Sequence, residues 1–272
     1  MPPAAGMYPE LFPNASHMKF SKLILAGILT LVSCSIREER EHCPCRLDMD
    51  LTAFSPYGRK ALVALWDGLD ASQEEVPVRD TLHRHVAKGI VGTSVWSGQR
   101  EGQLSGSRLI VPAGSQPDSL QAFRAEVDCR GETAWVTAVP HKQYARVTLR
   151  VDIGPDTHYP YQFYVESDCC GIDLADLAPV PGELVFPVRQ VADNLFRFDL
   201  LRHHPDTEVR IAIYDEKERA DYLPLGQWMR KAGYDWEAED LADILFDIDY
   251  VHQRLRIIIG NWEEGETVCL TL

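Results

Sequence analysis

Histidine and carboxylate side chains are the groups in this sequence that could bind a metal ion or move a proton. His83 and His85 are two residues apart in a strand-like stretch, so their imidazoles would share one face and could bind a metal. His203 and His204 precede Pro205, a pattern that predicts an exposed turn. For both pairs, ordinary surface residues are the favoured interpretation.

Three sets of acidic residues offer carboxylate oxygens of the kind that bind calcium. None has the spacing of the 12-residue calcium loop, so solvated surface is again favoured. The sets are Asp67 with Asp70, Glu237 with Glu239 and Asp240, and Asp247 with Asp249.

Motifs of the common enzyme classes are not found in the sequence. It has no G-x-S-x-G, no P-loop, no H-E-x-x-H and no zinc deaminase pair. The sequence therefore predicts a protein that is not an enzyme and needs no cofactor or metal. Its formal charge of −14 argues against nucleic acid as a partner, because phosphate contacts depend on Lys and Arg.

The strongest chemical signal is a cysteine that ends an apolar run. Lys19 and Lys22 precede the nearly uninterrupted apolar segment 23–32. Ten helical residues rise about 15 Å, half of a bilayer core, so the segment predicts an export signal rather than a membrane span. It ends in LVSC, residues 31–34, which resembles a bacterial lipobox. In such signals the cysteine thiol receives a diacylglycerol, and cleavage falls just before the cysteine.

These features divide the N-terminal region into a signal peptide, 1–33, and a lipidated tether, 34–45. Met18 begins a complete signal by itself, so residues 1–17 are interpreted as an over-called start. Two or more acyl chains give stable membrane anchoring, and Cys34 would hold a mature chain of formal charge −15 on the membrane. An ordinary signal peptide with a chance cysteine near its cleavage site is the alternative.

Six further cysteines leave the redox chemistry open. Cys43 and Cys45 are too close for an easy bridge, and the adjacent Cys169 and Cys170 would form a strained one. Their spacing does not fit a structural zinc site. Because an exported chain can form disulfides, a long-range bond remains an alternative to free thiols. The remaining two cysteines are Cys129 and Cys269.

Apolar residues alternate with polar ones along most of the chain, which predicts strands. In the first half the predicted strands are 46–53, 61–68, 108–114, 122–129 and 133–139, whereas 76–98 is ambiguous. In the second half they are 144–154, 159–167, 182–188, 194–201, 207–215, 251–259 and 266–272. The sequence predicts an all-β fold of two tandem β-sandwiches, 46–141 and 142–272.

A short helical insert interrupts the second sandwich. Leu225, Trp228 and Met229 have helical spacing, and Gly233 is the expected stop. Asp235 is expected to cap a second short helix that buries Leu241 and Ile244.

The six tryptophans suggest glycan binding as an alternative function, because indole faces stack on sugars. Trp66, Trp135 and Trp262 are predicted to be core or sheet-surface residues, and Trp228 belongs to the helix. Trp96 and Trp236 are the freer candidates, but two isolated rings do not make a sugar platform.

The two ends of the chain resemble the FimB/Mfa2 fimbrial anchor subunits of Gram-negative bacteria. After Cys34 and a charged tether, CPCRLDMDL (43–51) is similar to the C-P-C-x-L opening that precedes the family's first strand. Near the C-terminus, LPLGQWMRKAGYDW, LADILFDIDY and LRIIIGNW are similar to a segment shared by these anchors and related fimbrial proteins. The resemblance spans 34–262 in outline and is loose from 70 to 121.

The resemblance implies two transthyretin-like β-sandwiches and no catalytic residues. It also implies an outer-membrane lipoprotein on the cell surface, which holds the base of a pilus and influences fibre length, with a pilin stalk subunit as partner. Cys34, as the lipid attachment site, is the one functional residue that it transfers. A surface glycan-binding lipoprotein is the chief rival interpretation.

Strand complementation joins pilins of this class, since a strand from one subunit fills a groove in its neighbour. In related stalk subunits, proteolytic removal of an N-terminal strand opens that groove. Here the corresponding strand, 46–53, follows the lipid, so cleavage after it would release the body. We therefore expect the chain to keep this strand and to donate residues 266–272. The alternative is that 266–272 is a strand of its own sandwich.

Overall fold

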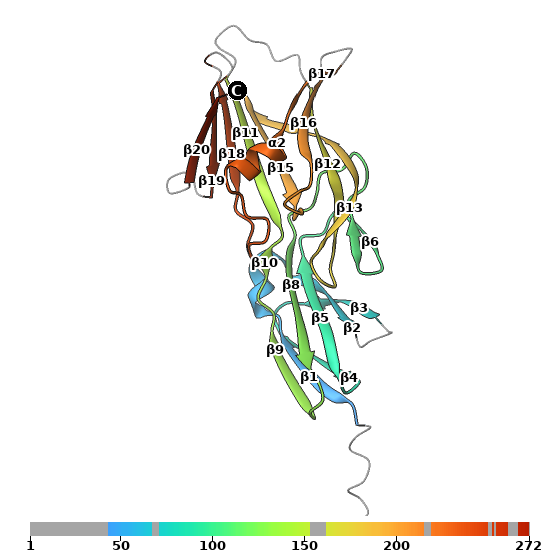
Figure 1. Ribbon diagram of the computed structural model, residues 1–272. Coiled ribbons are helices and arrows are strands. Elements are labelled where there is room, and N and C mark those ends of the chain that lie inside the picture. Colours follow the sequence, from blue (N-terminus) through green and yellow to red (C-terminus); the bar gives the residue numbers. More distant parts are fainter. Residues whose placement is uncertain are drawn as a thin grey trace, which may run out of the picture. The chain divides into compact units, whose positions relative to one another are not determined.

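The computed structural model describes residues 43–66, 71–152, 162–214, 219–249, 252, 254–260 and 266–271. The chain divides into two units, Met1–Pro44 and Cys45–Leu272, and the second contains every element described. Residues 1–42, with Cys34 and the predicted signal, lie outside the described residues. Within the described ranges, no helix has the length and apolar character needed to span a membrane. The fold is all-β with a short helix, as predicted (Figure 1).

The first sandwich consists of a three-stranded sheet and a five-stranded sheet. In the three-stranded sheet, β1 lies between β4, to which it is antiparallel, and β9, to which it is parallel. These strands are β1 Cys45–Asp50, β4 Thr81–Val86 and β9 Thr133–Thr137. The antiparallel five-stranded sheet has the order β10 His141–Lys142, β8 Gln121–Asp128, β5 Ile90–Ser97, β2 Lys60–Trp66 and β3 Ala71–Pro77.

The second sandwich consists of two larger sheets. One has the order β14 Arg189–Ala192, β15 Leu195–Leu201, β11 Tyr144–Asp152, β18 Ile244–Asp249, β19 Arg254–Ile259 and β20 Glu266–Thr271. The other has the order β17 Arg219–Leu223, β16 Val209–Tyr214, β12 Gln162–Asp173, β7 Arg108–Ile110 and β6 Gln103–Ser105, with β13 Pro179–Pro187 also paired to β12. β11 repeats the arrangement of β1, because it is antiparallel to β15 and parallel to β18.

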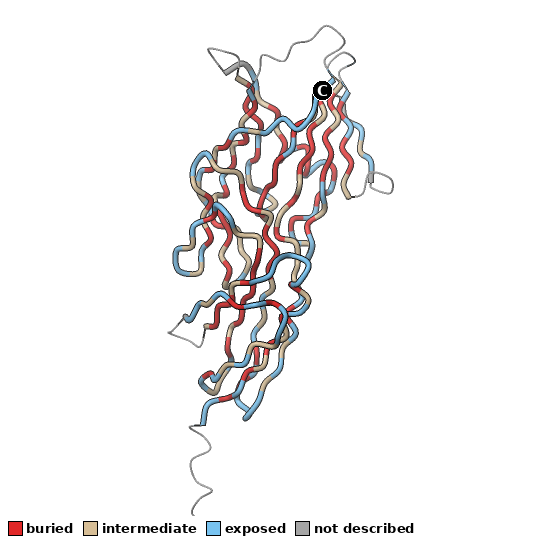
Figure 2. The backbone as a smooth tube through the Cα atoms, turned by 180° about the vertical axis from the view of Figure 1, so that it is seen from behind, coloured by how far each residue is buried: buried red, intermediate tan, exposed pale blue. Residues whose placement is uncertain are grey.

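Two apolar cores explain why these strands alternate (Figure 2). In β1, Leu47 and Met49 point into the first core, while the residues between them face outward. The second core is larger and includes the buried face of α2 Leu225–Lys231, with Leu225, Trp228 and Met229. Burial of these side chains is the main favourable contribution to folding.

The short hairpin β6–β7 comes from the first half of the sequence but completes a sheet of the second sandwich. β7 pairs with β12, where Ile110 lies opposite Gly171. A Cβ atom at Gly171 would lie 2.2 Å from the carbonyl oxygen of Leu109, so only glycine fits there. Close backbone packing therefore ties the two halves together.

Two local predictions need correction. The first strand ends at Asp50 rather than at residue 53, and the 3₁₀-helix η2 Thr52–Tyr57 follows it and buries Phe54. The second helix does not form. Instead, the Asp235 carboxylate accepts the backbone N–H of Glu237 in a turn (2.8 Å), and Ile244 begins β18.

The first helix agrees with its prediction. Gly233 stops it with φ 73°, a left-handed conformation that suits glycine.

Candidate functional site

The histidines of β4 are exposed, and His83 contacts neighbouring side chains. His83 Nδ1 lies 2.6 Å from the Asp48 carboxylate, which also accepts a hydrogen bond from Arg46 Nε at 2.8 Å. These hydrogen bonds, the one from His83 foremost, lower the pKa of Asp48. No group of three metal-ligating side chains occurs in the described part of the chain. This exposed position agrees with the prediction that His83 and His85 are ordinary surface residues.

His203 is a core residue, which corrects the prediction of an exposed turn. It is 3% exposed, and its ring stacks on Trp236 with centroids 4.9 Å apart. Nδ1 donates to the Leu201 carbonyl at 2.5 Å, so Nε2 accepts from the Ser167 hydroxyl at 2.7 Å. Burial lowers the pKa of His203 to about 4 and keeps the ring neutral. His204 is exposed, as predicted.

In the Ser167–His203 contact the serine hydroxyl donates to the imidazole, as a catalytic nucleophile does to its base. The contact is buried, however, and a substrate has no access to it. Ser167 is 4% exposed, and its oxygen also accepts the backbone N–H of Cys169 at 3.0 Å. A substrate could not reach this oxygen without opening the core. The pair therefore satisfies buried polar groups rather than forming a catalytic site.

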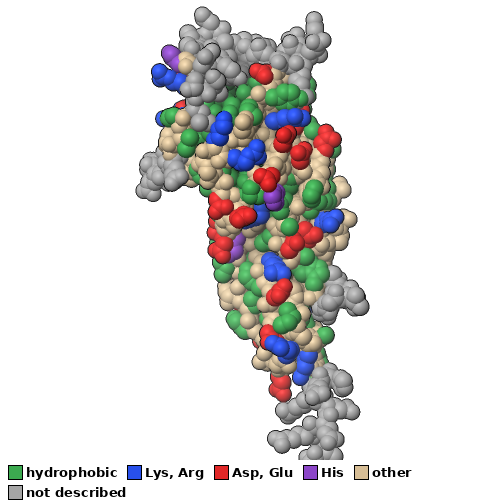
Figure 3. Space-filling model, in the orientation of Figure 1, with side chains coloured by type: hydrophobic (Ala, Val, Ile, Leu, Met, Phe, Trp, Pro, Cys, Tyr) green, Lys and Arg blue, Asp and Glu red, His purple; other side chains and the backbone are tan. Residues whose placement is uncertain are grey.

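Three residues of the predicted acidic sets, Asp240, Asp247 and Asp249, accept hydrogen bonds from neighbouring donors. Asp247 pairs with Arg150 at 2.7 Å and with Arg256 at 2.7 Å, and these contacts, led by the Arg150 hydrogen bond, lower its pKa. Asp249 accepts the backbone N–H of His252 at 2.9 Å. Figure 3 shows acidic and basic side chains interspersed over the visible face. Such pairing accounts for these carboxylates without calcium; Asp67 and Asp70 lie outside the described residues.

Two of the tryptophans differ from their predicted exposures. Trp96 and Trp236, the expected free rings, are buried at 0% and 5% exposure. Trp228 is buried on α2 as predicted, while Trp135 on β9 is 59% exposed. The described tryptophans thus offer one exposed indole and no row of them; Trp262 lies outside the described residues.

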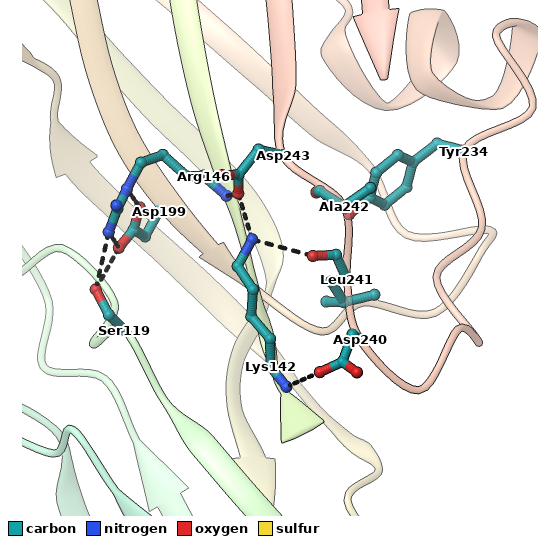
Figure 4. A network of polar contacts seen from close by, with 9 residues as sticks. All are labelled: Ser119, Lys142, Arg146, Asp199, Tyr234, Asp240, Leu241, Ala242 and Asp243. Atoms are coloured by element: carbon teal, nitrogen blue, oxygen red, sulfur yellow. Dashed lines mark hydrogen bonds and ion pairs between the residues drawn. The ribbon is translucent and has the colours of Figure 1, made fainter. Parts of the chain in front are cut away.

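A polar network lies where the chain passes from the first sandwich to the second (Figure 4). Arg146 on β11 binds Asp199 on β15 through Nε at 3.0 Å, and Ser119 donates to the same carboxylate at 2.6 Å. Lys142 forms an ion pair with Asp243, and its backbone N–H donates to Asp240 at 2.6 Å. The network joins β11 to segments far away in sequence, so it fixes the junction.

Alternation alone did not reveal this network. Arg146 and Asp199 are directly opposite in the register of β11 and β15, and this pairing requires knowledge of which strands are neighbours.

An open cleft of about 570 Å³ lies beside this junction, with Arg202, His203 and Trp236 in its wall. The Arg202 guanidinium donates to Gln143 Oε1 at 2.8 Å and to the carbonyls of Trp236 and Ala238 at 2.6 and 2.7 Å. Burial is the main cause that lowers the pKa of Arg202. Its donors are largely used by the 236–239 loop, so Arg202 secures that loop.

The first and last strands are the elements that the sequence singled out for assembly. β1 is the middle strand of its sheet, and Leu47 and Met49 are each 1% exposed. β20 is the last strand of its sheet and pairs with β19. Its Val268 is half-buried, whereas Thr267 is exposed. Pairing with β19 is the arrangement expected if 266–272 belongs to its own sandwich.

Comparison with known proteins gives a fold-level result. No family model and no curated protein matches this sequence. A Bacteroides thetaiotaomicron protein suggested to bind polysaccharide aligns with a TM-score of 0.60 and 13% identity, over 84% of this chain and 98% of its own. A candidate adhesin from Bacteroides ovatus aligns with a TM-score of 0.55 and 13% identity, over 86% and 97%.

The fimbrial anchor protein Mfa2 from Porphyromonas gingivalis aligns with a TM-score of 0.53 and 14% identity, over 81% of this chain and 98% of its own. The chain has the FimB/Mfa2-like fold. This fold confirms the resemblance of the two sequence ends at the level of architecture. The three neighbours are described as a polysaccharide-binding protein, an adhesin and a fimbrial anchor rather than as enzymes, consistent with the missing enzyme motifs.

Proposed function

We propose that this chain is an outer-membrane lipoprotein that anchors the base of a fimbria to the cell surface and influences fibre length. Acyl chains on Cys34 would hold it in the membrane, and the first pilin of the stalk would bind to its body. The observation that carries the proposal is the central position of β1 in a FimB/Mfa2-like fold. The strand nearest the tether is also one that the body cannot release.

Burial supports this role for β1. Cys45, Leu47, Met49 and Leu51 are at most 1% exposed and belong to the first core. Loss of β1 would separate β4 from β9 and open that core. An anchor that keeps this strand has a closed first sandwich and must join its partner by another element.

Residues 266–272 are the proposed joining element, donated to the first pilin. β20 lies at a sheet edge and contributes Val268 to the border of the second core. Its withdrawal would uncover β19 without breaking the order of the other five strands. Main-chain hydrogen bonds to a pilin groove would replace those to β19.

Two variants in cells that lack the native protein test the proposal. Cys34→Ser should release the protein from the outer membrane, because no thiol remains for lipid. Deletion of 267–272 should leave a folded, membrane-bound protein that sheds its fimbriae, while Thr267→Ala on the exposed face should retain them. The measurements are membrane fractionation and the amount of fimbriae in the medium.

The outcomes separate anchoring from strand donation. Fimbriae that stay attached to cells carrying Cys34→Ser would contradict the anchor. Fimbriae retained by a membrane-bound deletion variant would exclude donation of 267–272 and leave the anchor in place.

Glycan binding has one observation in its favour, the exposed indole of Trp135. Asp48 lies opposite Trp135 in the register of β1 and β9, so a carboxylate adjoins the ring. Soluble polysaccharides in native affinity gels test this alternative. A retardation that Trp135→Ala abolishes would support it, and unchanged mobility with all polysaccharides would exclude it.

A further inference from the structure

Two cysteines lie together in the first core. Cys45 and Cys129 are each 0% exposed and belong to the same apolar cluster. Cys45 is the first residue of β1, and Cys129 follows β8 directly. The two residues come from the facing sheets of the sandwich, so their side chains approach each other across its interior.

Backbone contacts fix this approach on both sides. The N–H of Arg46, next to Cys45, donates to the carbonyl of Glu132 at 2.9 Å, three residues after Cys129. The N–H of Cys129 donates to the Gly89 carbonyl at 2.7 Å. Cys45 and Cys129 are both free thiols in this structure, and Cys45 is a neighbour that, after burial, contributes to raising the pKa of Cys129. A disulfide requires this kind of proximity, because the two sulfurs must approach to about 2.05 Å.

Cys169 and Cys170 contact nearby carbonyls. The thiol of the buried Cys169 donates to the Gly171 carbonyl at 3.3 Å, and the thiol of its sequence neighbour Cys170 interacts with carbonyls of β13. Cys43 and Cys269 are exposed. The pair that shares the first core is Cys45 and Cys129.

We propose that Cys45 and Cys129 form a disulfide in the exported protein. The inference rests on the proposed function for one point, the passage of the chain into an oxidising compartment. It places a covalent bond at the first residue of the body, where the tether meets β1.

Thiol–disulfide exchange with a protein disulfide of that compartment balances the reaction. One cysteine thiolate attacks the oxidant disulfide, a mixed disulfide forms, and one oxidant thiolate leaves. The second cysteine then attacks the mixed disulfide and releases the second oxidant thiolate. The two cysteines lose two protons and two electrons, and the oxidant ends as a dithiol.

Oxidation must precede closure of the core. Burial, together with the neighbouring Cys45, raises the pKa of the Cys129 thiol to about 12 in the folded protein. The attacking species is the thiolate, which is therefore scarce after folding. The bond would form while β1 and β8 assemble, and the closed core would then protect it from reduction.

The bond changes how the body bears tension. Without it, a pull on residues before Cys45 loads the hydrogen bonds of β1 to β4 and β9, beginning at Arg46. With it, the same pull passes from the Cys45 sulfur into the end of β8. The tether would be held by covalent structure in the first sandwich rather than by the ladder of one six-residue strand.

A non-reducing tryptic map of protein recovered from outer membranes tests the proposal. Alkylation in a denaturing lysis buffer without reductant should leave Cys45 and Cys129 unmodified and yield EHCPCR (41–46) linked to AEVDCR (125–130). Cys43→Ser should keep the link, and Cys269→Ser serves as a matched control on an exposed thiol. Wild type that has been unfolded and refolded in reductant should melt roughly 5–15 °C below the untreated wild type. The double variant Cys45→Ala/Cys129→Ala should show no such shift.

Two results would overturn the proposal: full alkylation of both cysteines without reductant, or a link that disappears in Cys43→Ser. Either result would leave anchoring untouched if fimbriae stay on the cells. Conversely, loss of anchoring with the linked peptide present would contradict the proposed function alone.

Discussion

β1 and β20 open and close the same body but stand in opposite situations. β1 has a hydrogen-bonded neighbour on each side and buries alternate residues in the first core, whereas β20 pairs with β19 and borders the second core. The difference teaches which of the two strands can leave the body without unfolding it. A central strand is removed only by unfolding its sandwich, while an edge strand can exchange its partner.

The largest expected effect comes from truncating one side chain in each strand. Leu47→Ala should lower the free energy of unfolding by about 2–5 kcal/mol, because it leaves a cavity in a closed core. Val268→Ala removes fewer atoms from a half-buried site and should cost about 1 kcal/mol or less. Urea denaturation measures both. Equal decreases in the free energy of unfolding for the two variants would contradict the proposed difference between the two strands.

Acid should destabilise the second sandwich more than the first. His203 is the buried imidazole of the second core; its folded pKa is about 4, against an ordinary value of 6.5. As pH falls below 6.5, the unfolded state binds the proton first. The free energy of unfolding should therefore decline from pH 6.5 to about 4, by up to roughly 3 kcal/mol, and then level off.

His203→Gln should flatten this decline, and the exposed neighbour provides a matched control in His204→Gln. Hydrogen exchange should show amides of the second sandwich losing protection before those of β1. A decline that survives His203→Gln would assign the acid sensitivity to other groups.

The smallest expected effect concerns the outer face of β1. The hydrogen bonds from His83 and Arg46 lower the pKa of Asp48, so their contribution is present above the ordinary Asp value and lost as pH falls below it. Asp48→Asn should slightly reduce the pH dependence of stability below about pH 4. The pair is exposed, so 1 M salt should weaken the effect. A large or salt-independent change would mean that β1 depends on its surface rather than on its core.

Predictability from sequence follows how cleanly apolar and polar residues alternate along each strand. β1, β8 and β11 alternate cleanly and were predicted. β3 and β4 lie at sheet edges and bury few side chains, which left 76–98 ambiguous. β18 buries residues on both faces, among them Leu245 and Phe246, and a short run of this kind suits a helix as well as a strand.

The burial of several individual side chains was not predicted from the sequence. His203 precedes a turn, yet its ring packs on Trp236 from a segment more than thirty residues away in the sequence. Trp96 lies on β5, a strand that the sequence left unassigned. Pairing of Cys45 with Cys129 likewise requires knowing which sheets face each other. Periodicity identifies elements, but contacts between distant elements depend on topology.

The β6–β7 hairpin makes the halves of this chain poor candidates for independent modules. Residues 103–110 emerge from the ribosome well before β12, the strand against which they finally rest. The newborn first half must carry this hairpin without its partner until about sixty more residues have been synthesised. A fragment that starts at residue 142 would lack both strands of the hairpin, and grafting that fragment onto another protein of this fold would transplant an unfinished sheet.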